Sequence, residues 1–173
     1  LSISPELFFR IDQDKIVARP MKGTSPRGVT PQEDRSNKEW LSTSRKIRAE
    51  NVMIADLLRN DVGRIARNVW VPRLFEVEKY RTVYQMTSTI EGRLKDNLKI
   101  KDIFCALFPS GSVTGAPKIR TMRIIRGLEK EPRGVYTGAI GYFSPQRKAC
   151  FNVAIRTAHL KDGKGEVGIG GGI

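Results

Sequence analysis

The stretch that decides the fold is VYTGAIGYF at Val135–Phe143, followed by the turn SPQRK at 144–148 and by ACFNVAIRTAHL at Ala149–Leu160. A second turn, KDGKG at 161–165, leads into Glu166–Ile173. Runs rich in β-branched and aromatic residues, joined by short turns, predict an antiparallel meander. Because strands do not alternate with helices along the chain, a doubly wound parallel sheet is disfavoured.

Upstream of this meander, apolar residues recur with the periods of strands and helices. The segment Gly23–Asn37 is rich in Gly, Pro, Ser and Thr, which predicts a mobile surface loop beside Lys22. The expected strands are Leu7–Ile11, Lys15–Arg19, Val71–Val77 and Thr82–Ile90, and the expected helices are Arg45–Asn60, Ile100–Phe108 and one that begins at Pro117 with Ile119, Met122, Ile125 and Leu128 on its apolar face.

The composition bounds the class of protein. The chain has 173 residues, of which 39% are hydrophobic and 28% charged, enough to bury one core and too few for two comfortable domains. No apolar run approaches the roughly 20 residues of a membrane span, and the first residues do not resemble a signal peptide. Cys105 and Cys150 lack metal-ligand spacing, so we expect reduced thiols, a cytoplasmic location and no membrane partner.

The charge balance is strongly basic, with 31 Lys and Arg against 18 Asp and Glu and a formal net charge of +13. Such a surplus suits either a nucleic-acid surface or an anionic substrate. The basic residues form no run of five or more, and the aromatic residues do not interleave with them as base-stacking platforms would. A basic nucleic-acid-binding module is therefore kept only as the alternative from another class.

Two charged side chains stand out from their surroundings. Glu50 lies on the same helical stripe as Ile54 and Leu58, where an unpaired buried carboxylate is costly. It therefore has a cation, a basic partner or a metal opposite it, or else it reaches solvent at the helix edge. Lys22 follows a strand end directly, and taken alone a lysine in a Gly-Thr-Ser-Pro loop is simply solvated.

Other segments offer groups for an anionic ligand. SVTGAPK at Ser112–Lys118 joins a Gly-containing turn to a helix N-terminus, where free N–H groups attract a carboxylate or phosphate, although an ordinary helix start is the more frequent meaning. The glycines within 168–172 either admit a ligand close to the backbone or mark bulges or crowding. Tyr136 and Arg156 lie on neighbouring expected strands, where Arg156 either pairs with a carboxylate or is solvated.

Taken together, these motifs resemble the chorismate-binding enzymes, in the family order and from Ser4 to Ile173. The resemblance rests on Ser4-Pro5-Glu6, Pro20-Met21-Lys22-Gly23-Thr24, Glu50-Asn51-Val52-Met53, Asp56-Leu57-Leu58-Arg59-Asn60-Asp61, the Gly111–Lys118 stretch and the final glycines. It implies an α+β fold, an antiparallel β-sandwich with outer helices and the site between its sheets. Residues 1–173 are then expected to be the C-terminal part of a chorismate-binding catalytic domain, truncated at both ends and inactive alone.

Within this family, the residue at the position of Lys22 separates the branches. Anthranilate synthases and the isochorismate group typically have alanine there, whereas lysine is typical of aminodeoxychorismate synthases. The resemblance therefore implies conversion of chorismate and ammonia to 4-amino-4-deoxychorismate, for para-aminobenzoate and folate synthesis, with anthranilate synthase as the alternative within the family. Ammonia is expected from a glutamine amidotransferase, as a separate subunit or a fused domain. Gln85 stands where many relatives have histidine.

The resemblance also implies residue roles. Lys22 is the expected nucleophile, attacking C2 of chorismate and expelling the C4 hydroxyl before ammonia adds at C4 and releases the lysine. Glu6 is the expected general acid, and Glu50 is the expected ligand of the Mg²⁺ cofactor that anchors the ring carboxylate. The residues implied to bind the substrate are Gln85, Ser112, Thr114, Gly115, Tyr136, Arg156, Gly170, Gly171 and Gly172.

Overall fold

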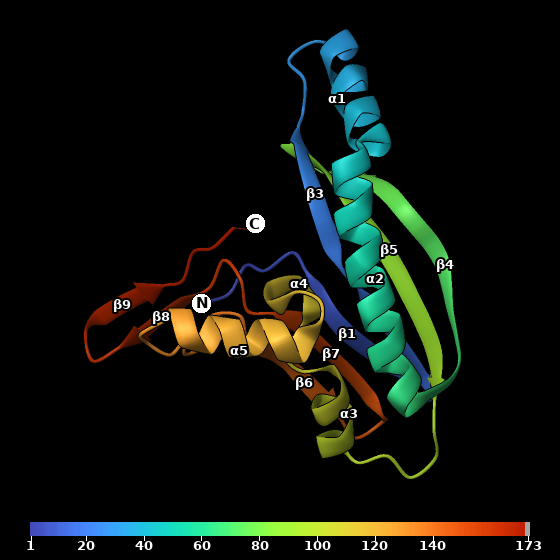
Figure 1. Ribbon diagram of the computed structural model, residues 1–173, viewed down its shortest axis with the longest axis vertical. Coiled ribbons are helices and arrows are strands. Elements are labelled where there is room, and N and C mark those ends of the chain that lie inside the picture. Colours follow the sequence, from blue (N-terminus) through green and yellow to red (C-terminus); the bar gives the residue numbers. More distant parts are fainter. Residues whose placement is uncertain (172–173) are drawn as a thin grey trace.

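The computed structural model describes residues 1–171, which form one large antiparallel sheet with helices packed against it (Figure 1). The elements in chain order are β1 (Leu7–Asp12), β2 (Lys15–Arg19), β3 (Met21–Pro26), α1 (Pro31–Thr43), α2 (Arg45–Ile65), β4 (Ala66–Lys79), β5 (Val83–Leu94), α3 (Ile100–Leu107), α4 (Gly111–Thr114), α5 (Lys118–Leu128), β6 (Ala139–Ser144), β7 (Lys148–Val153), β8 (Ala158–Lys161) and β9 (Lys164–Val167).

Strand β5 is the centre of the sheet because three other strands pair along it. On one edge it pairs with β4, and on its other edge it pairs first with β3 and then with β2. The hairpin of β1 and β2 then leads to β7 and β6, so that the strand order is β3-β5-β2-β1-β7-β6. Every pairing is antiparallel.

The expected α+β class with an antiparallel sheet is confirmed, but the meander is divided. β6 and β7 pair with each other and join the main sheet through β1, whereas β8 and β9 pair only with each other. Residues 1–171 therefore contain one large sheet and a separate hairpin, in place of two large sheets. The division follows β7, where the run expected from Ala149 to Leu160 is interrupted at 154–157.

The core forms where α2 and α3 pack on one face of the sheet. The apolar stripe of α2 is confirmed, and the helix continues five residues beyond the expected end at Asn60. Ile54 and Leu58 are each 2% exposed, and Phe9 of β1 is completely buried beside Phe104 of α3 and Phe151 of β7. The three phenylalanine rings lie 5.2–5.6 Å apart, which fixes α3 against β1 and β7.

The expected mobile loop at Gly23–Asn37 is wrong, because β3 and α1 occupy most of it. Arg27 donates to both carboxylate oxygens of Asp34 at 2.5 and 2.7 Å, and the Tyr84 hydroxyl donates to Asp34 at 2.7 Å. The hydrogen bond from Arg27 holds the pKa of Asp34 well below its usual range, so the carboxylate stays charged. These contacts tie the connection between β3 and α1 to the start of β5.

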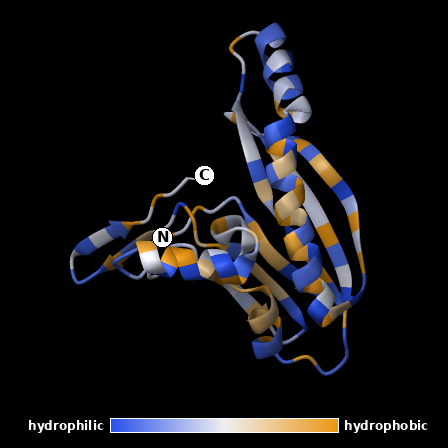
Figure 2. Cartoon of the chain, viewed as in Figure 1, coloured by the Kyte–Doolittle hydropathy of each residue, from blue (hydrophilic) through white to orange (hydrophobic). Residues whose placement is uncertain are grey.

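The ribbon has two arms that meet at an angle (Figure 1). The longer arm contains α1, α2, β3, β4 and β5, and the shorter arm contains α5, β8 and β9. The apolar face expected on α5 is present, but no residue of α5 is buried, and Ile119 and Leu128 are 69% and 76% exposed. Apolar and charged residues alternate on the visible face of this helix in Figure 2. Among residues 1–171, no helix is long and apolar enough to span a membrane.

We predict that Phe9→Ala lowers the free energy of unfolding by about 3–5 kcal/mol, because it empties the centre of the phenylalanine cluster. Ile124→Ala on α5, where the side chain is 45% exposed, is the matched control and should change stability by less than about 1 kcal/mol. Urea denaturation of the full-length protein measures both values. Equal losses for the two variants would show that the cluster does not stabilise the fold.

Candidate active site

Lys22 lies in a β-bulge. Met21 pairs with Thr87 and Thr24 pairs with Gln85, so β3 advances three residues while β5 advances two. Gly23 has a φ of +99°, and a Cβ there would lie 2.3 Å from Cγ2 of Ile47 on α2. The bulge therefore needs a glycine for its conformation and for its close approach to α2. It also breaks the alternation of side chains along β3 at Lys22.

Glu6 is buried beside this bulge. Its side chain is 4% exposed, and its neighbours are the Ser112 hydroxyl, the Lys22 charge and the backbone N–H of Met21. Burial raises the pKa of Glu6, although hydrogen bonding from Ser112 and the positive charge of Lys22 act in the opposite direction. Glu6, Lys22 and Ser112 are thus brought together, although Glu6 and Ser112 are 106 positions apart in the sequence. Glu6 keeps its proton to a higher pH than an exposed glutamate.

A buried ion pair holds the Ser112 segment against α2. Ser112 lies in the single turn α4, and α5 begins at Lys118, one residue later than expected. Lys118 donates to Asp61 of α2 and, at 3.0 Å, to the carbonyl of Leu107 at the end of α3. The side chains of Lys118 and Asp61 are only 13% and 11% exposed, so losing either one would leave a buried charge unpaired.

Thr114 and Gly115 follow Ser112 and shape the same connection. The Thr114 hydroxyl donates to the carbonyl of Ser110 at 2.9 Å, and Gly115 has a φ of +110°. The glycine is needed here because this backbone conformation is strained for other residues. Binding of an anion by these residues stays a prediction.

Glu50 is half-exposed on α2. It both reaches solvent and lies near a basic side chain, so each of the two expected alternatives holds in part. Its nearest cation is Lys46, with Nζ 3.9 Å from the carboxylate, and the Glu50 side chain is 38% exposed. One available carboxylate fits Mg²⁺, which proteins often hold through one or two carboxylates together with water and substrate oxygens. Within residues 1–171 no three His, Cys, Asp or Glu side chains form a metal-binding group.

The expected position of Tyr136 and Arg156 on neighbouring strands is wrong. Tyr136 lies in the turn before β6, and Arg156 lies between β7 and β8 with a φ of +49°. The turn that contains Tyr136 is nevertheless tied to the end of β7, because Thr137 N–H donates to the carbonyl of Ala154 at 2.9 Å. Arg156 follows β7 by three residues, and its carbonyl accepts from the N–H of Ile3 at 3.2 Å. The Arg156 side chain is exposed.

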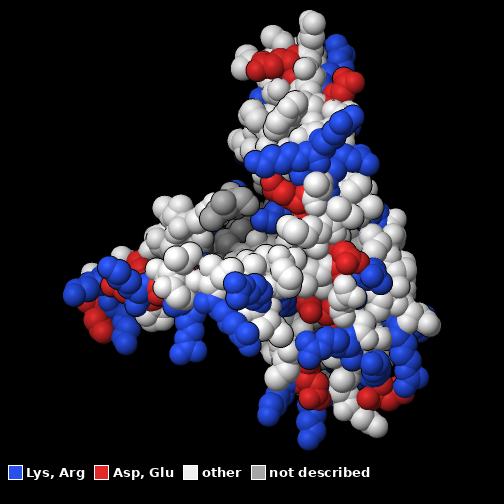
Figure 3. All heavy atoms as spheres, in the orientation of Figure 1, with Lys and Arg blue, Asp and Glu red and all other residues white. Residues whose placement is uncertain are grey.

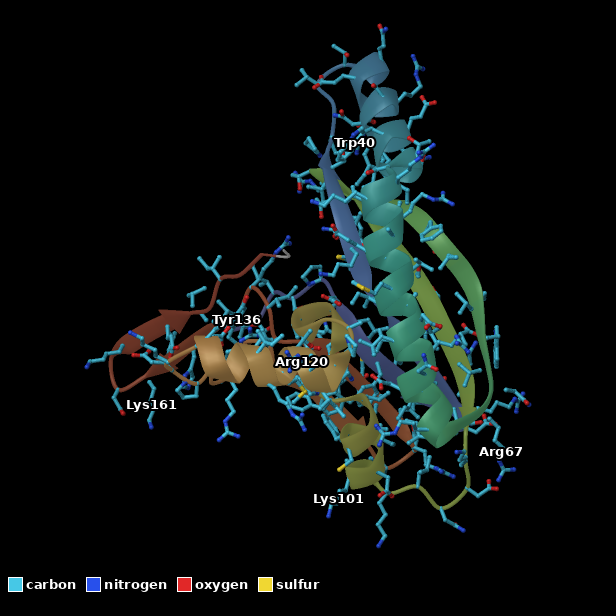
Figure 4. All side chains as sticks on the ribbon, viewed as in Figure 1. Trp40, Arg67, Lys101, Arg120, Tyr136 and Lys161 are labelled. Atoms are coloured by element: carbon cyan, nitrogen blue, oxygen red, sulfur yellow. The ribbon has the colours of Figure 1, made fainter. Side chains whose placement is uncertain are left out.

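The glycines after β9 are crowded by Tyr136. A Cβ at Gly168 would lie 2.2 Å from Cγ of Tyr136, and one at Gly170 would lie 2.4 Å from its hydroxyl oxygen. Figure 4 shows Tyr136 in the shorter arm, beside the chain that continues from β9. Of the two expected meanings of these glycines, crowding holds for Gly168 and Gly170, whereas a Cβ at Gly171 would meet nothing within 4 Å. Gly172 lies outside the described residues.

Residues 1–6 connect the region around Tyr136 and Arg156 to the cluster of Glu6, Lys22 and Ser112. They run beside the end of β7, where Val153 N–H donates to the carbonyl of Glu6 at 3.1 Å and Asn152 donates to Ser4 at 3.0 Å. An open hollow of about 570 Å³ beside α5 is lined partly by Thr114 and Tyr136 and does not reach Lys22. Apart from Gln85 and Gly172, the expected substrate residues thus form two neighbouring groups, one at 112–115 and one around the end of β7.

Gln85 is buried at 3% exposure, and its Oε1 has no hydrogen-bond partner in the described part of the chain. Tyr84 and Ser88 face α1 and α2, so the alternation along β5 places Gln85 on the opposite face of the sheet. No hydrogen bond joins Gln85 to Glu6, Lys22 or Ser112 within residues 1–171. Its contact with a substrate stays a prediction.

Sequence reasoning missed two supporting residues of the site, Asn51 and Asp61. Both are buried on α2, and the exposed fractions of the whole residues are 0% for Asn51 and 8% for Asp61. Their spacing from Ile54 and Leu58 puts them on the apolar stripe, as positions 51, 54, 58 and 61 follow a helical period. The sequence therefore contained a signal for their role, because Asn51 and Asp61 are polar residues on an otherwise apolar stripe, as Glu50 is.

The basic residues do not gather at one place on the visible face. Figure 3 shows Lys and Arg over both arms, with Asp and Glu among them. Several of the cations are already paired, including Arg19 with Glu78 and Lys118 with Asp61. This distribution lacks the single basic surface that is typical of a nucleic-acid-binding module.

The sequence profile of the chorismate binding enzymes matches residues 1–173, so the chain belongs to this family. It is 49% identical to an aminodeoxychorismate synthase from Streptomyces griseus, with 100% of the chain and 24% of the relative covered. It is 47% identical to aminodeoxychorismate synthase component 1 from Salmonella typhimurium, with 100% and 38% covered. The crystal structure of anthranilate synthase component I from Streptococcus pneumoniae is similar at 39% identity and a TM-score of 0.85, with 95% of this chain and 36% of that chain covered.

We predict that Gly23→Ala destabilises the full-length protein by about 1–3 kcal/mol, because the positive φ and the contact with Ile47 both oppose a side chain. Gly63→Ala in α2 is the matched control. A Cβ there meets nothing within 4 Å, so this variant should gain about 0.5–1 kcal/mol from helix propensity. Chemical denaturation distinguishes the two, and a neutral or stabilising Gly23→Ala would contradict the packed bulge.

The raised pKa of Glu6 predicts a pH-dependent stability. Above the ordinary carboxyl pKa of 4.5, the folded state binds more protons than the unfolded state, so the free energy of unfolding falls as pH rises toward the folded pKa of Glu6. Glu6→Gln removes this loss. The Tm of the variant relative to the wild type should therefore increase as the pH rises above 4.5 toward the folded pKa of Glu6. A Tm difference that does not change with pH would contradict the burial of a titrating Glu6.

Proposed function

We propose that the protein containing this chain is an aminodeoxychorismate synthase, which converts chorismate and ammonia to 4-amino-4-deoxychorismate. The observation that carries the proposal is the buried Glu6 carboxyl beside Lys22 and the Ser112 hydroxyl. A nucleophile and a proton donor within one enclosed cluster suit displacement of a hydroxyl group by an amine. The chain spans 24% and 38% of the two aminodeoxychorismate synthases it resembles, so the activity is assigned to the whole protein.

In the proposed reaction, Lys22 acts first as a nucleophile. Its unprotonated amine forms a bond to C2 of chorismate and loses a proton, while both ring double bonds shift, to C1–C6 and C4–C5, and the C4–O bond breaks. Ammonia then forms a bond at C4 and loses a proton, both double bonds shift back, and the Nζ–C2 bond breaks as the lysine nitrogen takes up a proton, which releases the lysine. The bulge at Lys22–Gly23 supports this role, because it fixes the backbone from which the amine projects.

Glu6 is the proposed proton donor. A hydroxyl group leaves poorly as hydroxide, and a carboxyl kept protonated by burial can deliver the proton that turns it into water. The Ser112 hydroxyl and the Met21 N–H lie beside the Glu6 carboxyl and favour its charged form, which would form when the proton is delivered. Glu50 is the residue of this chain proposed to hold Mg²⁺, and the ion, when bound, neutralises the ring carboxylate of chorismate.

The remaining parts of the proposal concern partners. Tyr136, Arg156 and the glycines at 170 and 171 are proposed to hold the substrate around the end of β7. The ammonia is proposed to come from a glutamine amidotransferase, as a separate component or a fused domain, and the reaction to take place in the cytoplasm. The name of the Salmonella relative, component 1, supports a separate component.

Anthranilate formation is the second candidate. The similarity to the anthranilate synthase from Streptococcus pneumoniae, at 39% identity, favours it. The two functions differ in their need for Lys22, because in the first proposal the amine forms a covalent bond to the substrate.

We predict that Lys22→Ala in the full-length protein lowers ammonia-dependent formation of 4-amino-4-deoxychorismate by at least about a hundredfold. The exposed Lys38→Ala on α1 is the control and should retain full activity. Chromatography and mass spectrometry of reactions with chorismate, Mg²⁺ and ammonium identify the product. Anthranilate as the main product would reject the proposed function, whereas undiminished formation of 4-amino-4-deoxychorismate by Lys22→Ala would reject the covalent role of Lys22.

A further inference from the structure

We propose that Asn51 is a positioning residue that fixes Lys22 in the active site. The inference rests on the proposed function, in which Lys22 is the nucleophile. Asn51 follows Glu50 directly on α2, and its side chain is completely buried. A buried carboxamide is costly unless its donors and acceptor are paired, so its partners show what it holds in place.

The partners of Asn51 come from two strands, β3 and β5. Its Nδ2 donates to the carbonyls of Lys22 in β3 and Met86 in β5, both at 3.4 Å, and its Oδ1 accepts from the Ser88 hydroxyl. The Ser88 oxygen in turn accepts from the N–H of Phe75 in β4 at 3.2 Å. The carboxamide orientation is thereby set, because the oxygen is engaged by Ser88 and the nitrogen points to the two carbonyls.

The bulge explains why these carbonyls need Asn51. Between the pairs Met21–Thr87 and Thr24–Gln85 the ladder is interrupted, so Lys22 has no registered partner on β5. A bulge leaves its extra residue unpaired, and a buried backbone carbonyl requires a donor. Asn51 provides that donor from α2. It does the same for Met86 on the facing strand, and so it closes the gap in the ladder.

The position of Asn51 connects the interrupted pairing at Lys22 to the residues proposed to act on the substrate. One turn of α2 carries both the Glu50 carboxylate and the amide that holds the Lys22 backbone, so the two functional residues share one support. A displacement of about 1 Å in a reacting group can lower a rate by about a hundredfold. Loss of the amide should therefore move the Lys22 amine relative to Glu6 and the substrate, while the groups around the end of β7 still bind chorismate.

The kinetic test compares Asn51→Ala and Ser88→Ala in the full-length protein with two controls. Asn51→Ala should lower kcat by at least about tenfold and leave the KM for chorismate within about threefold, and Ser88→Ala should lower kcat less. Asn60→Ala, on the exposed side of the same helix, should leave kcat unchanged. Ile65→Ala, in the core at the end of α2, reports the effect of lost stability alone and should retain kcat while folded.

A second measurement does not depend on the reaction. Competitive acylation followed by peptide mass spectrometry should show that Asn51→Ala changes the labelling rate of Lys22 at least about threefold, with Lys38 unchanged. An unaltered Lys22 labelling rate, or a kcat that falls no further than in Ile65→Ala, would overturn the positioning role. If the wild-type protein forms no 4-amino-4-deoxychorismate, the proposed function fails and the labelling of Lys22 alone decides the role of Asn51.

Discussion

The packing of the Lys22–Gly23 bulge against helix α2 is the contact on which the rest of the site depends. Gly23 admits the helix because it has no side chain, and Ile47 occupies the space that a Cβ would need. The same helix carries Glu50 and contributes Asp61 to the ion pair that holds the Ser112 segment. Because one rigid helix contacts both the bulge and the Ser112 segment, the Glu6, Lys22 and Ser112 groups converge from distant parts of the chain.

The sequence predicted the parts of this arrangement whose signal is local. The helical stripe of Ile54 and Leu58, the antiparallel strands and the family motifs did not require knowledge of distant contacts. The ordered segment after Lys22 was predicted wrongly, because its Gly, Pro and Ser content resembles a loop while its order comes from Asp34 reaching Arg27 and Tyr84. Arg156 was misplaced because the strand expected after Ala149 is interrupted near Ala154, and Tyr136 because β6 begins only at Ala139.

The burial of Glu6 is a further property that the sequence could not supply. A glutamate in Ser4-Pro5-Glu6 has no local feature that predicts a raised pKa, because the pKa is raised by burial in the folded chain, whereas the neighbouring Ser112 and Lys22 lower it. The exposed apolar side chains of α5 are the opposite case. Their helical period was correctly predicted, but a period predicts an apolar face and not what covers it, and within residues 1–171 the helix packs mainly on α4.

The proposed reaction requires that Lys22 become covalently bound to the substrate. This step can be tested by rapid quenching of the full-length protein with chorismate and Mg²⁺ in the absence of ammonia, followed by peptide mass spectrometry. We expect the peptide containing Lys22 to gain the mass of chorismate less one water, and added ammonia to remove the adduct. Normal formation of 4-amino-4-deoxychorismate with no adduct on Lys22 at any quench time would contradict this step.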